Sequence, residues 1–392
     1  MKLLTHVVAT FHELTLKGGN RGFFQRALAA NIETALAGLP LAEVSIPARV
    51  VIRFSRPVPW SAIHPRLATV FGLNNLIPVT WVGTTYDELE AYVAGELATI
   101  TTGPFAVHCQ RSYKQFPLTS MDVDRRLGAF VHERTGLPVD LSHPATELGV
   151  LVQPDGIYYY RERFAGAGGL PVGTSGRVMV LMSGGIDSPA AAFMTTKRGT
   201  RAIYVHFHSV PYTPDASIRK VEEIVRILNR HQGASRLALV PFAEFQREVV
   251  ARSPDRLRVV LYRRMMMRVA ERLARRWRCH ALVTGEALNQ VASQTLANLA
   301  VIDRVVYLPV LRPLVGMDKD EIITIAQRAR TFETSILPAQ DCCSFLQPAH
   351  PATHCSALEC EAAEQDLDVD GWMRRLAGDA EVRHVEPLPW AE

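Results

Sequence analysis

The sequence has no hydrophobic run long enough to cross a bilayer. Its longest apolar stretches, such as Val178–Met182, have the length of a β-strand, whereas a membrane helix needs about 20 apolar residues. Only six cysteines occur in 392 residues, too few for a disulfide scaffold. The first residues meet polar side chains too early for a secretory signal. We therefore expect a cytoplasmic protein with no membrane contact, in which cysteine serves catalysis or metal binding.

A large net charge is also missing, because 43 basic residues face 39 acidic ones. The charges are unevenly distributed, however. From Arg247 to Arg278 eleven arginines stand against three acids, and over residues 356–392 ten acids stand against three arginines. This asymmetry predicts either a surface for a polyanionic partner or two solvated helix faces.

The order of strand and helix patterns divides the chain into four segments. Residues 1–78 and 79–165 each mix strands and helices, which predicts two small α+β domains. Residues 166–176 are rich in glycine and read as a linker, either a hinge or a loop pressed against a ligand. Residues 177–392 alternate strand and helix, which predicts a doubly wound parallel α/β sheet that binds its ligand at the carboxyl ends of the strands.

The sharpest motif, S-G-G-I-D-S, lies between the first predicted strand and helix of this sheet. Small residues let the backbone approach a ligand closely, and the amides and dipole at a helix start favour an anion. No lysine follows the glycines, so the motif is not a Walker A loop, and it is not G-x-G-x-x-G either. A tight turn with a well-capped helix is the alternative to a phosphate cradle. The cradle would consist of Ser183, Gly184, Gly185, Asp187 and Ser188.

This motif resembles the pyrophosphatase loop of the ATP pyrophosphatases, enzymes that adenylate a substrate and release pyrophosphate. Further motifs narrow the resemblance to the tRNA 4-thiouridine synthetases, a family of tRNA uracil-4 sulfurtransferases also linked to thiazole formation in thiamine biosynthesis. These motifs occupy residues 169–176, 205–209, 284–295 and 312–319. Residues 13–21 resemble the ferredoxin-like domain of the family, and residues 105–140 resemble its THUMP domain.

The adjacent cysteines Cys342 and Cys343 are the candidate sulfur carriers. Sulfur transfer needs one thiolate that holds a terminal sulfur as a persulfide and a second thiol that releases it. Either cysteine suits the first role; the resemblance assigns Cys342 to it and leaves Cys343 as a resolving thiol. Two inert buried cysteines are the alternative. A zinc or iron–sulfur site that adds Cys355 and Cys360 is weaker, because adjacent cysteines suit a single metal poorly and no C-x-x-C is present, so we assign no zinc or iron–sulfur ligands.

The resemblance also implies ATP and Mg²⁺ as cofactors. Asp187 would manage magnesium and pyrophosphate, although an acid at this position also complements a helix dipole. Lys319 would neutralise phosphate charge; the alternative is a solvated lysine. The implied nucleotide contacts are Leu181, Met182, His206, Phe207, Arg263, Gly285 and Gln294.

Basic residues next to glycine or aromatic residues predict the RNA contacts. They are Lys17, Arg21, Arg111 and Lys114, and the arginines of residues 256–278 would extend the track. Each residue alone is equally consistent with a solvated charge, and the resemblance favours tRNA as the partner.

Together these features predict an enzyme that adenylates a tRNA uridine, at position 8 in this family, and replaces its ring oxygen with sulfur from Cys342. Only about forty residues follow Pro351, too few for the rhodanese domain of some members, so we expect sulfur to come directly from a cysteine desulfurase or from another donor. His12 departs from the glycine often found there in the family. The oligomeric state stays open, a homodimer included.

Two other classes of function share part of this pattern. A different ATP pyrophosphatase would have the loop but lack the N-terminal segments and the Asp341-Cys342-Cys343 motif. A non-catalytic RNA-binding module would need neither the intact loop nor the paired cysteines.

Overall fold

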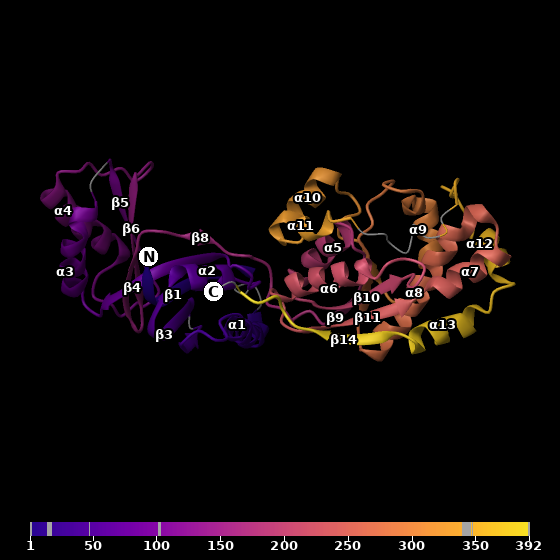
Figure 1. Ribbon diagram of the computed structural model, residues 1–392. Helices are drawn as coiled ribbons and strands as arrows, with labels where there is room; N and C mark the ends of the chain where they lie inside the picture. Colours follow the sequence, from indigo (N-terminus) through magenta and orange to yellow (C-terminus); the bar gives the residue numbers. More distant parts are fainter. Residues whose placement is uncertain are drawn as a thin grey trace. The chain divides into compact units, whose positions relative to one another are not determined.

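The computed structural model describes residues 2–13, 18–46, 48–100, 103–338, 346 and 348–390. It divides into two compact units, Met1–Gly168 and Gly169–Glu392 (Figure 1). No helix in the described ranges combines the length and apolarity needed to cross a bilayer.

The first unit is built on one eight-stranded sheet with the order β2-β3-β1-β4-β7-β6-β5, and β8 pairs with β4. Its strands are β1 (Leu3–Thr10), β2 (Leu41–Ser45), β3 (Val50–Pro59), β4 (Asn75–Gly83), β5 (Phe105–Arg111), β6 (Thr146–Gln153), β7 (Gly156–Tyr160) and β8 (Phe164–Ala165). Its helices are α1 (Arg21–Ala35), α2 (Trp60–Leu67), α3 (Tyr86–Glu96) and α4 (Ser120–Thr135).

Strand β4 joins the two predicted α+β segments, because it pairs with β1 on one edge and with β7 and β8 on the other. Its sequence contains Pro78, which has no N–H for a sheet ladder and hides the strand from sequence patterns. Pro78 is tolerated because it falls between the β8 pairing at Asn75 and Leu76 and the β7 pairing that begins at Thr80.

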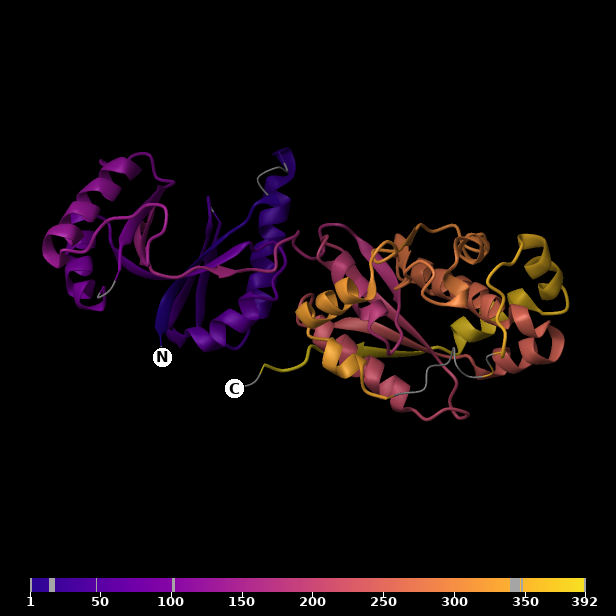
Figure 2. The ribbon, with the colours of Figure 1, turned by 90° about the horizontal axis from the view of Figure 1, so that it is seen from above.

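Helices α3 and α4 pack together beside strands β5 to β7, and Figure 2 shows both on the same side of these strands. Helix α4 buries Val123, Leu127 and Val131, which are spaced four residues apart and form one apolar stripe. Thr119 and Asp122 form a capping box at its start, and Gly136 ends it in the left-handed conformation. Local sequence signals therefore suffice to define this helix.

The second unit contains a six-stranded sheet with the order β13-β12-β9-β10-β11-β14. Its strands are β9 (Arg177–Leu181), β10 (Arg201–His208), β11 (Ser235–Pro241), β12 (Ala281–Val283), β13 (Val310–Leu311) and β14 (Glu381–Val385). The first five are parallel, as the sequence predicts, whereas β14 adds an antiparallel edge next to β11. The order reverses at β9, with β10 on one side and β12 on the other, which is where doubly wound sheets bind ligands.

Two groups of helices cover this sheet. Helices α5 (Asp187–Thr196), α6 (Ala216–Asn229), α10 (Lys319–Arg328) and α11 (Phe332–Ser335) contact one another and lie together in Figure 1. The second group packs around the long helix α8 and comprises α7 (Ala243–Arg252), α8 (Arg258–Arg276), α9 (Leu296–Asp303), α12 (Ala357–Glu364) and α13 (Val369–Gly378).

Both faces of the central strands are buried. Met179, Ile203 and Val205 belong to the core shared with α8. Their neighbours along the strands point to the opposite face because side chains alternate, and there α5 and α6 pack. Burial on both faces explains why β9 and β10 read as nearly continuous apolar runs.

Candidate active site

A cavity of about 430 Å³ opens in the second unit, at the carboxyl ends of β9, β10 and β12. This is the size of a small-molecule site and the location expected for a doubly wound sheet. The strand ends, the loop before α5, one side of α8 and residues 284–294 form its wall. The lining residues include Leu181, Met182, Ser183, Gly185, Asp187, Ser188, His206, Phe207, Arg263, Gly285, Glu286, Gln290 and Gln294.

The loop between β9 and α5 is held by serine side chains. The Ser183 amide donates to Ser188 Oγ at 2.8 Å, and the two hydroxyl oxygens lie 3.0 Å apart. Helix α5 begins at Asp187, so the backbone amides of its first turn have no acceptor within the helix. These amides and the helix dipole make the loop suitable for a phosphate group.

Gly285 brings the residues after β12 into direct contact with this loop. A Cβ atom at position 285 would lie 2.5 Å from the Ser188 backbone nitrogen and 2.6 Å from the Asp187 carbonyl carbon. Such distances do not occur for real Cβ atoms, so only glycine allows this approach. The two segments thus form one continuous wall of the cavity.

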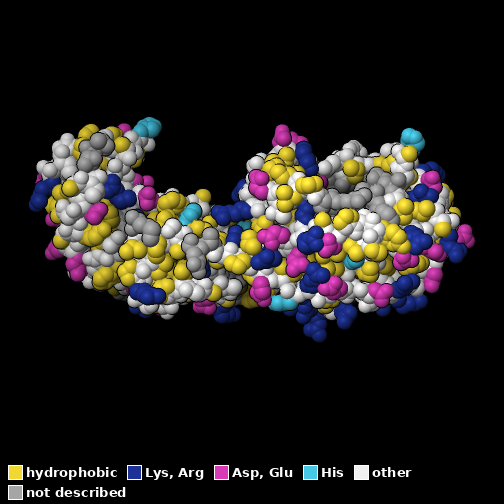
Figure 3. Space-filling model, viewed as in Figure 1, with side chains coloured by type: hydrophobic (Ala, Val, Ile, Leu, Met, Phe, Trp, Pro, Cys, Tyr) yellow, Lys and Arg dark blue, Asp and Glu magenta, His cyan; other side chains and the backbone are white. Residues whose placement is uncertain are grey.

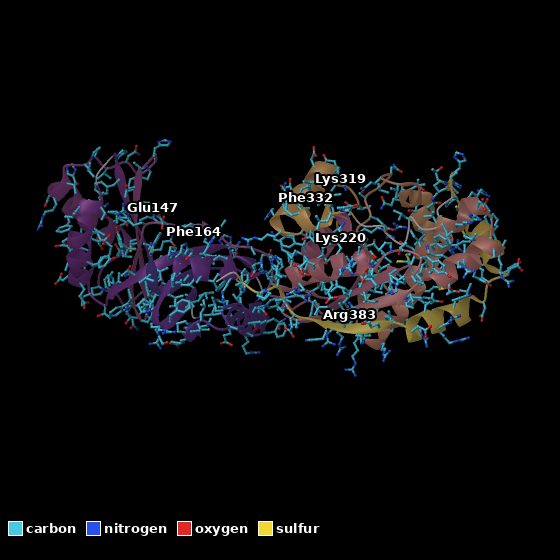
Figure 4. All side chains as sticks on the ribbon, viewed as in Figure 1. Glu147, Phe164, Lys220, Lys319, Phe332 and Arg383 are labelled. Carbon is cyan, nitrogen blue, oxygen red and sulfur yellow. The ribbon has the colours of Figure 1, made fainter. Side chains whose placement is uncertain are left out.

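Asp187 is held by two residues that are distant in sequence. Lys319 Nζ donates to Asp187 Oδ1 at 2.9 Å, and Gln290 Nε2 donates to Asp187 Oδ2 at 3.2 Å. Lys319 is the first residue of α10, where Asp318 caps the helix with a reciprocal bond to Glu321, and Figure 4 labels it there. A carboxylate and an ammonium group therefore stand together beside the phosphate loop.

Other residues that line the cavity provide apolar side chains and two buried hydrogen-bond acceptors. Burial lowers the pKa of His206 to about 4, so the ring is neutral at pH 7. Its Nδ1 atom lies 2.9 Å from the Met182 carbonyl oxygen, which can only accept, so Nδ1 carries the proton and Nε2 is an acceptor. His206 Nε2 and Gln294 Oε1 are both buried without a hydrogen-bond partner. Both residues line the cavity, so its wall contains two buried acceptors without a partner.

A buried carboxylate, Glu286, lies in the wall between two arginines. Arg312 Nε donates to Glu286 Oε2 at 2.6 Å, and Arg263 bonds the other carboxylate oxygen. Burial alone would raise the pKa of Glu286, but the charges of Arg263 and Arg312 hold the pKa below its ordinary value. The carboxylate is therefore ionised.

Most of the sequence-predicted nucleotide residues meet in this cavity. Leu181, Met182, Ser183, Gly185, Asp187, Ser188, His206, Phe207, Arg263, Gly285 and Gln294 all line it, and Gly184 belongs to the same loop. The sequence did not single out Glu286 or Gln290. Both lie within residues 284–295, one of the motifs that resemble the family. The position of Glu286, an acid directly after the glycine at a strand end, could have identified it as a site residue.

The proposed sulfur carriers Cys342 and Cys343 lie outside the described residues. Cys355 and Cys360 are buried; burial raises the pKa of both thiols, that of Cys360 to about 12, so neither is a ready nucleophile. Among the described residues, no three His, Cys, Asp or Glu side chains gather as metal ligands.

The predicted RNA contacts belong to the first unit, and Lys17 lies outside the described residues. Lys114 is exposed, and Arg21 is the half-buried first residue of α1. Arg111 donates to the carbonyl oxygens of Phe116 and Leu118 at 2.8 and 2.9 Å. It therefore shapes the loop that carries Lys114.

The arginine-rich segment is partly neutralised within the protein. Eight of the eleven arginines between Arg247 and Arg278 form ion pairs. Three of them reach the acidic C-terminal segment, where Arg256 pairs with Glu359, and Arg264 and Arg268 both pair with Glu364. Basic and acidic side chains are accordingly interspersed on the face of this unit shown in Figure 3. Part of the charge asymmetry of the sequence thus reflects pairing between the two segments.

Comparison with known proteins assigns each part of the chain. The family described as thiamine biosynthesis protein (ThiI) matches residues 173–369, its ferredoxin-like domain matches residues 6–76, and the THUMP domain matches residues 85–160. A probable tRNA sulfurtransferase of Moorella thermoacetica is 41% identical over 98% of this chain and 99% of its own length. One of Thermus thermophilus is 43% identical over 91% of this chain and 88% of its own.

The fold is also that of a solved enzyme. A crystal structure described as a 4-thiouridine synthetase–RNA complex with bound ATP matches with a TM-score of 0.87 and 35% identity, covering 98% of this chain and all of the other. Ferredoxin-like, THUMP and pyrophosphatase-loop domains in this order confirm the fold predicted from the sequence. The chain belongs to the ThiI family of tRNA sulfurtransferases.

Proposed function

We propose that the protein is an ATP-dependent tRNA sulfurtransferase that converts a tRNA uridine, at position 8, into 4-thiouridine. The observation that carries this proposal is the cavity at the switch point of the second sheet, which is lined by a phosphate loop, by Asp187 with its partner Lys319 beside it, and by His206 and Gln294 with their buried acceptors. The similarity to a synthetase solved with RNA and ATP supports the same assignment.

Two polar groups of the cavity-lining residues fit adenine. His206 Nε2 and Gln294 Oε1 both accept, so they suit a ligand that presents N–H donors, as the 6-amino group of adenine does. Phe207, Met266 and Met267 line the cavity and offer apolar surface to the ring. Guanine, which carries a carbonyl oxygen at that position, would place a third acceptor there.

The phosphates of ATP would then lie at the loop before α5. Lys319 supplies positive charge that stabilises the departing pyrophosphate, and the amides at the start of α5 bind phosphate oxygens. Asp187 is the carboxylate available to hold Mg²⁺, which prefers one or two carboxylates together with phosphate oxygens and would offset the phosphate charge when bound. Lys319 and Gln290 fix the orientation of that carboxylate.

The chemical sequence follows from these positions. The uridine O4 atom attacks the α-phosphorus of ATP, pyrophosphate leaves, and the ring carbon C4 gains AMP as a good leaving group. The terminal sulfur of a Cys342 persulfide attacks C4 and expels AMP. The thiolate of Cys343, or of another cysteine, then attacks Cys342 Sγ; the new disulfide releases 4-thiouridine and must be reduced before the next cycle.

Sulfur reaches Cys342 from a cysteine desulfurase in this proposal. The first unit, with Lys17, Arg21, Arg111 and Lys114, binds the tRNA through its phosphates.

A reconstituted reaction with unmodified tRNA, ATP, Mg²⁺, cysteine and a cysteine desulfurase tests the proposal, with nucleosides analysed by mass spectrometry. The wild type is expected to form 4-thiouridine, and Cys342→Ser is expected to form none while its affinities for ATP and tRNA stay within about twofold. Cys279→Ser is a matched control, since this cysteine is buried in the core between α8 and β12 rather than in the proposed carrier motif. Thiolation by Cys342→Ser would show that another residue carries the sulfur.

A further inference from the structure

The two arginines at Glu286 belong to a longer row of alternating charges. Arg312 donates to both oxygens of Asp303, at 2.8 and 2.6 Å, and its Nε atom donates to Glu286 at 2.6 Å. Arg263 pairs with the other oxygen of Glu286. The order is therefore Asp303, Arg312, Glu286, Arg263.

The two ends of this row lie in different surroundings. Arg263 and Glu286 line the cavity. The Asp303 side chain, at the opposite end, is 38% exposed, whereas Glu286 is 4% exposed. Water screens the negative end, while the positive end meets the proposed nucleotide.

We propose that Arg312 is a positioning residue for ATP: it holds and neutralises Glu286, so that Arg263 presents an oriented and uncompensated positive charge to the nucleotide. Arg312 does not line the cavity, so it acts on the nucleotide only through Glu286 and Arg263. This role rests on the proposed function, because it takes ATP as the occupant of the cavity.

The geometry separates this role from that of an ordinary structural ion pair. Arg312 uses three nitrogen atoms on two carboxylates, and the Thr284 hydroxyl adds a fourth bond, to Glu286 Oε2 at 2.8 Å. These bonds fix the orientation of the Glu286 carboxylate, and the carboxylate in turn orients the Arg263 side chain. Removal of Arg312 would leave Glu286 to cancel the charge of Arg263, so the cavity would lose its cationic end.

The loss of Arg312 has a pH signature. Glu286 would keep Arg263 and the Thr284 hydroxyl as partners, and without Arg312 the effect of burial would raise its pKa above that in the wild type. Below that pKa the carboxylate is neutral and Arg263 regains its free charge. Among the described residues that line the cavity, the other charged or titratable groups are Asp187 on α5 and His206 on β10, and the His206 pKa of about 4 lies below the range tested.

The test is the ATP dissociation constant, measured by calorimetry between pH 5.5 and 8.5 for the wild type and for Arg312→Met. The titration of ATP itself cancels in the ratio of the two constants. We expect the dissociation constant of Arg312→Met to exceed that of the wild type by a factor of about ten or more at pH 8.5, equivalent to about 1.4 kcal/mol. This factor should fall several-fold towards pH 5.5. Arg312→Lys should restore most of the affinity, because it returns the positive charge.

Two further variants separate positioning from a structural role. The double variant Glu286→Gln, Arg312→Met lacks the titrating carboxylate. The ratio of its ATP dissociation constant to that of the wild type should therefore not change with pH. Arg268→Met, which breaks an equally buried ion pair with Glu364 away from the cavity, should bind ATP like the wild type at every pH. A pH-independent ratio for Arg312→Met, or the same loss in Arg268→Met, would overturn the proposal. Since ATP binding is measured directly, these outcomes are independent of whether tRNA is thiolated.

Discussion

Gly285→Ala is the substitution whose effect follows most directly from the geometry of the site. The added methyl group would lie 2.5 Å from the Ser188 nitrogen, whereas ordinary van der Waals contact begins at 3.4 Å. Either the residues after β12 or the start of α5 must therefore move by roughly 0.9 Å. Both neighbours are backbone atoms, so no side chain can rotate away.

The expected cost has two parts. Overpacking of this kind destabilises a protein by about 1–3 kcal/mol. In a unit of this length, Gly169–Glu392, that corresponds to a Tm lowered by roughly 2–12 °C. The effect on activity should be larger, because a displacement of about 1 Å at a reacting centre costs on the order of a hundredfold in rate.

The assay is single-turnover thiolation of tRNA at saturating ATP, together with thermal unfolding of the same samples. Gly378→Ala, at the end of α13, is the matched control, because an added Cβ there has no atom within 4 Å. If Gly285→Ala thiolates and unfolds like Gly378→Ala, the contact between Gly285 and the phosphate loop is refuted.

Two other predictions concern ion pairs with opposite roles. Lys319→Met should lower the rate of thiolation by about a hundredfold or more, because it removes a charge that stabilises the departing pyrophosphate. It should change the free energy of unfolding by less than about 1 kcal/mol, because the pair with Asp187 is partly exposed. A loss of Tm large enough to account for the lost activity would contradict this prediction. Glu364→Gln should instead cost about 3–5 kcal/mol of unfolding free energy, measured by denaturant titration, because it leaves Arg264 and Arg268 unpaired. Burial raises the pKa of Glu364, yet the bonds from both arginines lower it to about 2, against 4.5 for an unpaired glutamate. The wild type should therefore lose this contribution to stability as the pH falls from 4.5 towards 2. The free energy of unfolding of Glu364→Gln should depend less on pH in the same range.

The sequence predicted the parts of the fold that depend on local patterns. Apolar strands that alternate with amphipathic helices indicated the parallel sheet, and the glycine-serine loop marked its ligand end. Strand β14 was not predicted, because its five residues lie far along the chain from β11 and only tertiary pairing identifies them as part of the sheet. Proline concealed β4 in the same way.

The site shows a similar division. Residues that contact the proposed nucleotide occupy recognisable motifs, so the sequence located them. Glu286 and Arg312 act through each other across 26 positions, and no periodicity reveals such a pair. The arginine-rich segment was open to two interpretations for the same reason, since its partners Glu359 and Glu364 lie about 100 residues away.

The central claim is that the protein activates the uridine oxygen by adenylation before sulfur replaces it. A tRNA that carries ¹⁸O at position 4 of its target uridine tests this claim directly, since adenylation transfers that oxygen atom to the α-phosphate. After reaction with ATP and the sulfur donor, mass spectrometry should find one ¹⁸O in AMP for each 4-thiouridine formed. Recovery of the label in water or in pyrophosphate, with unlabelled AMP, would contradict the claim.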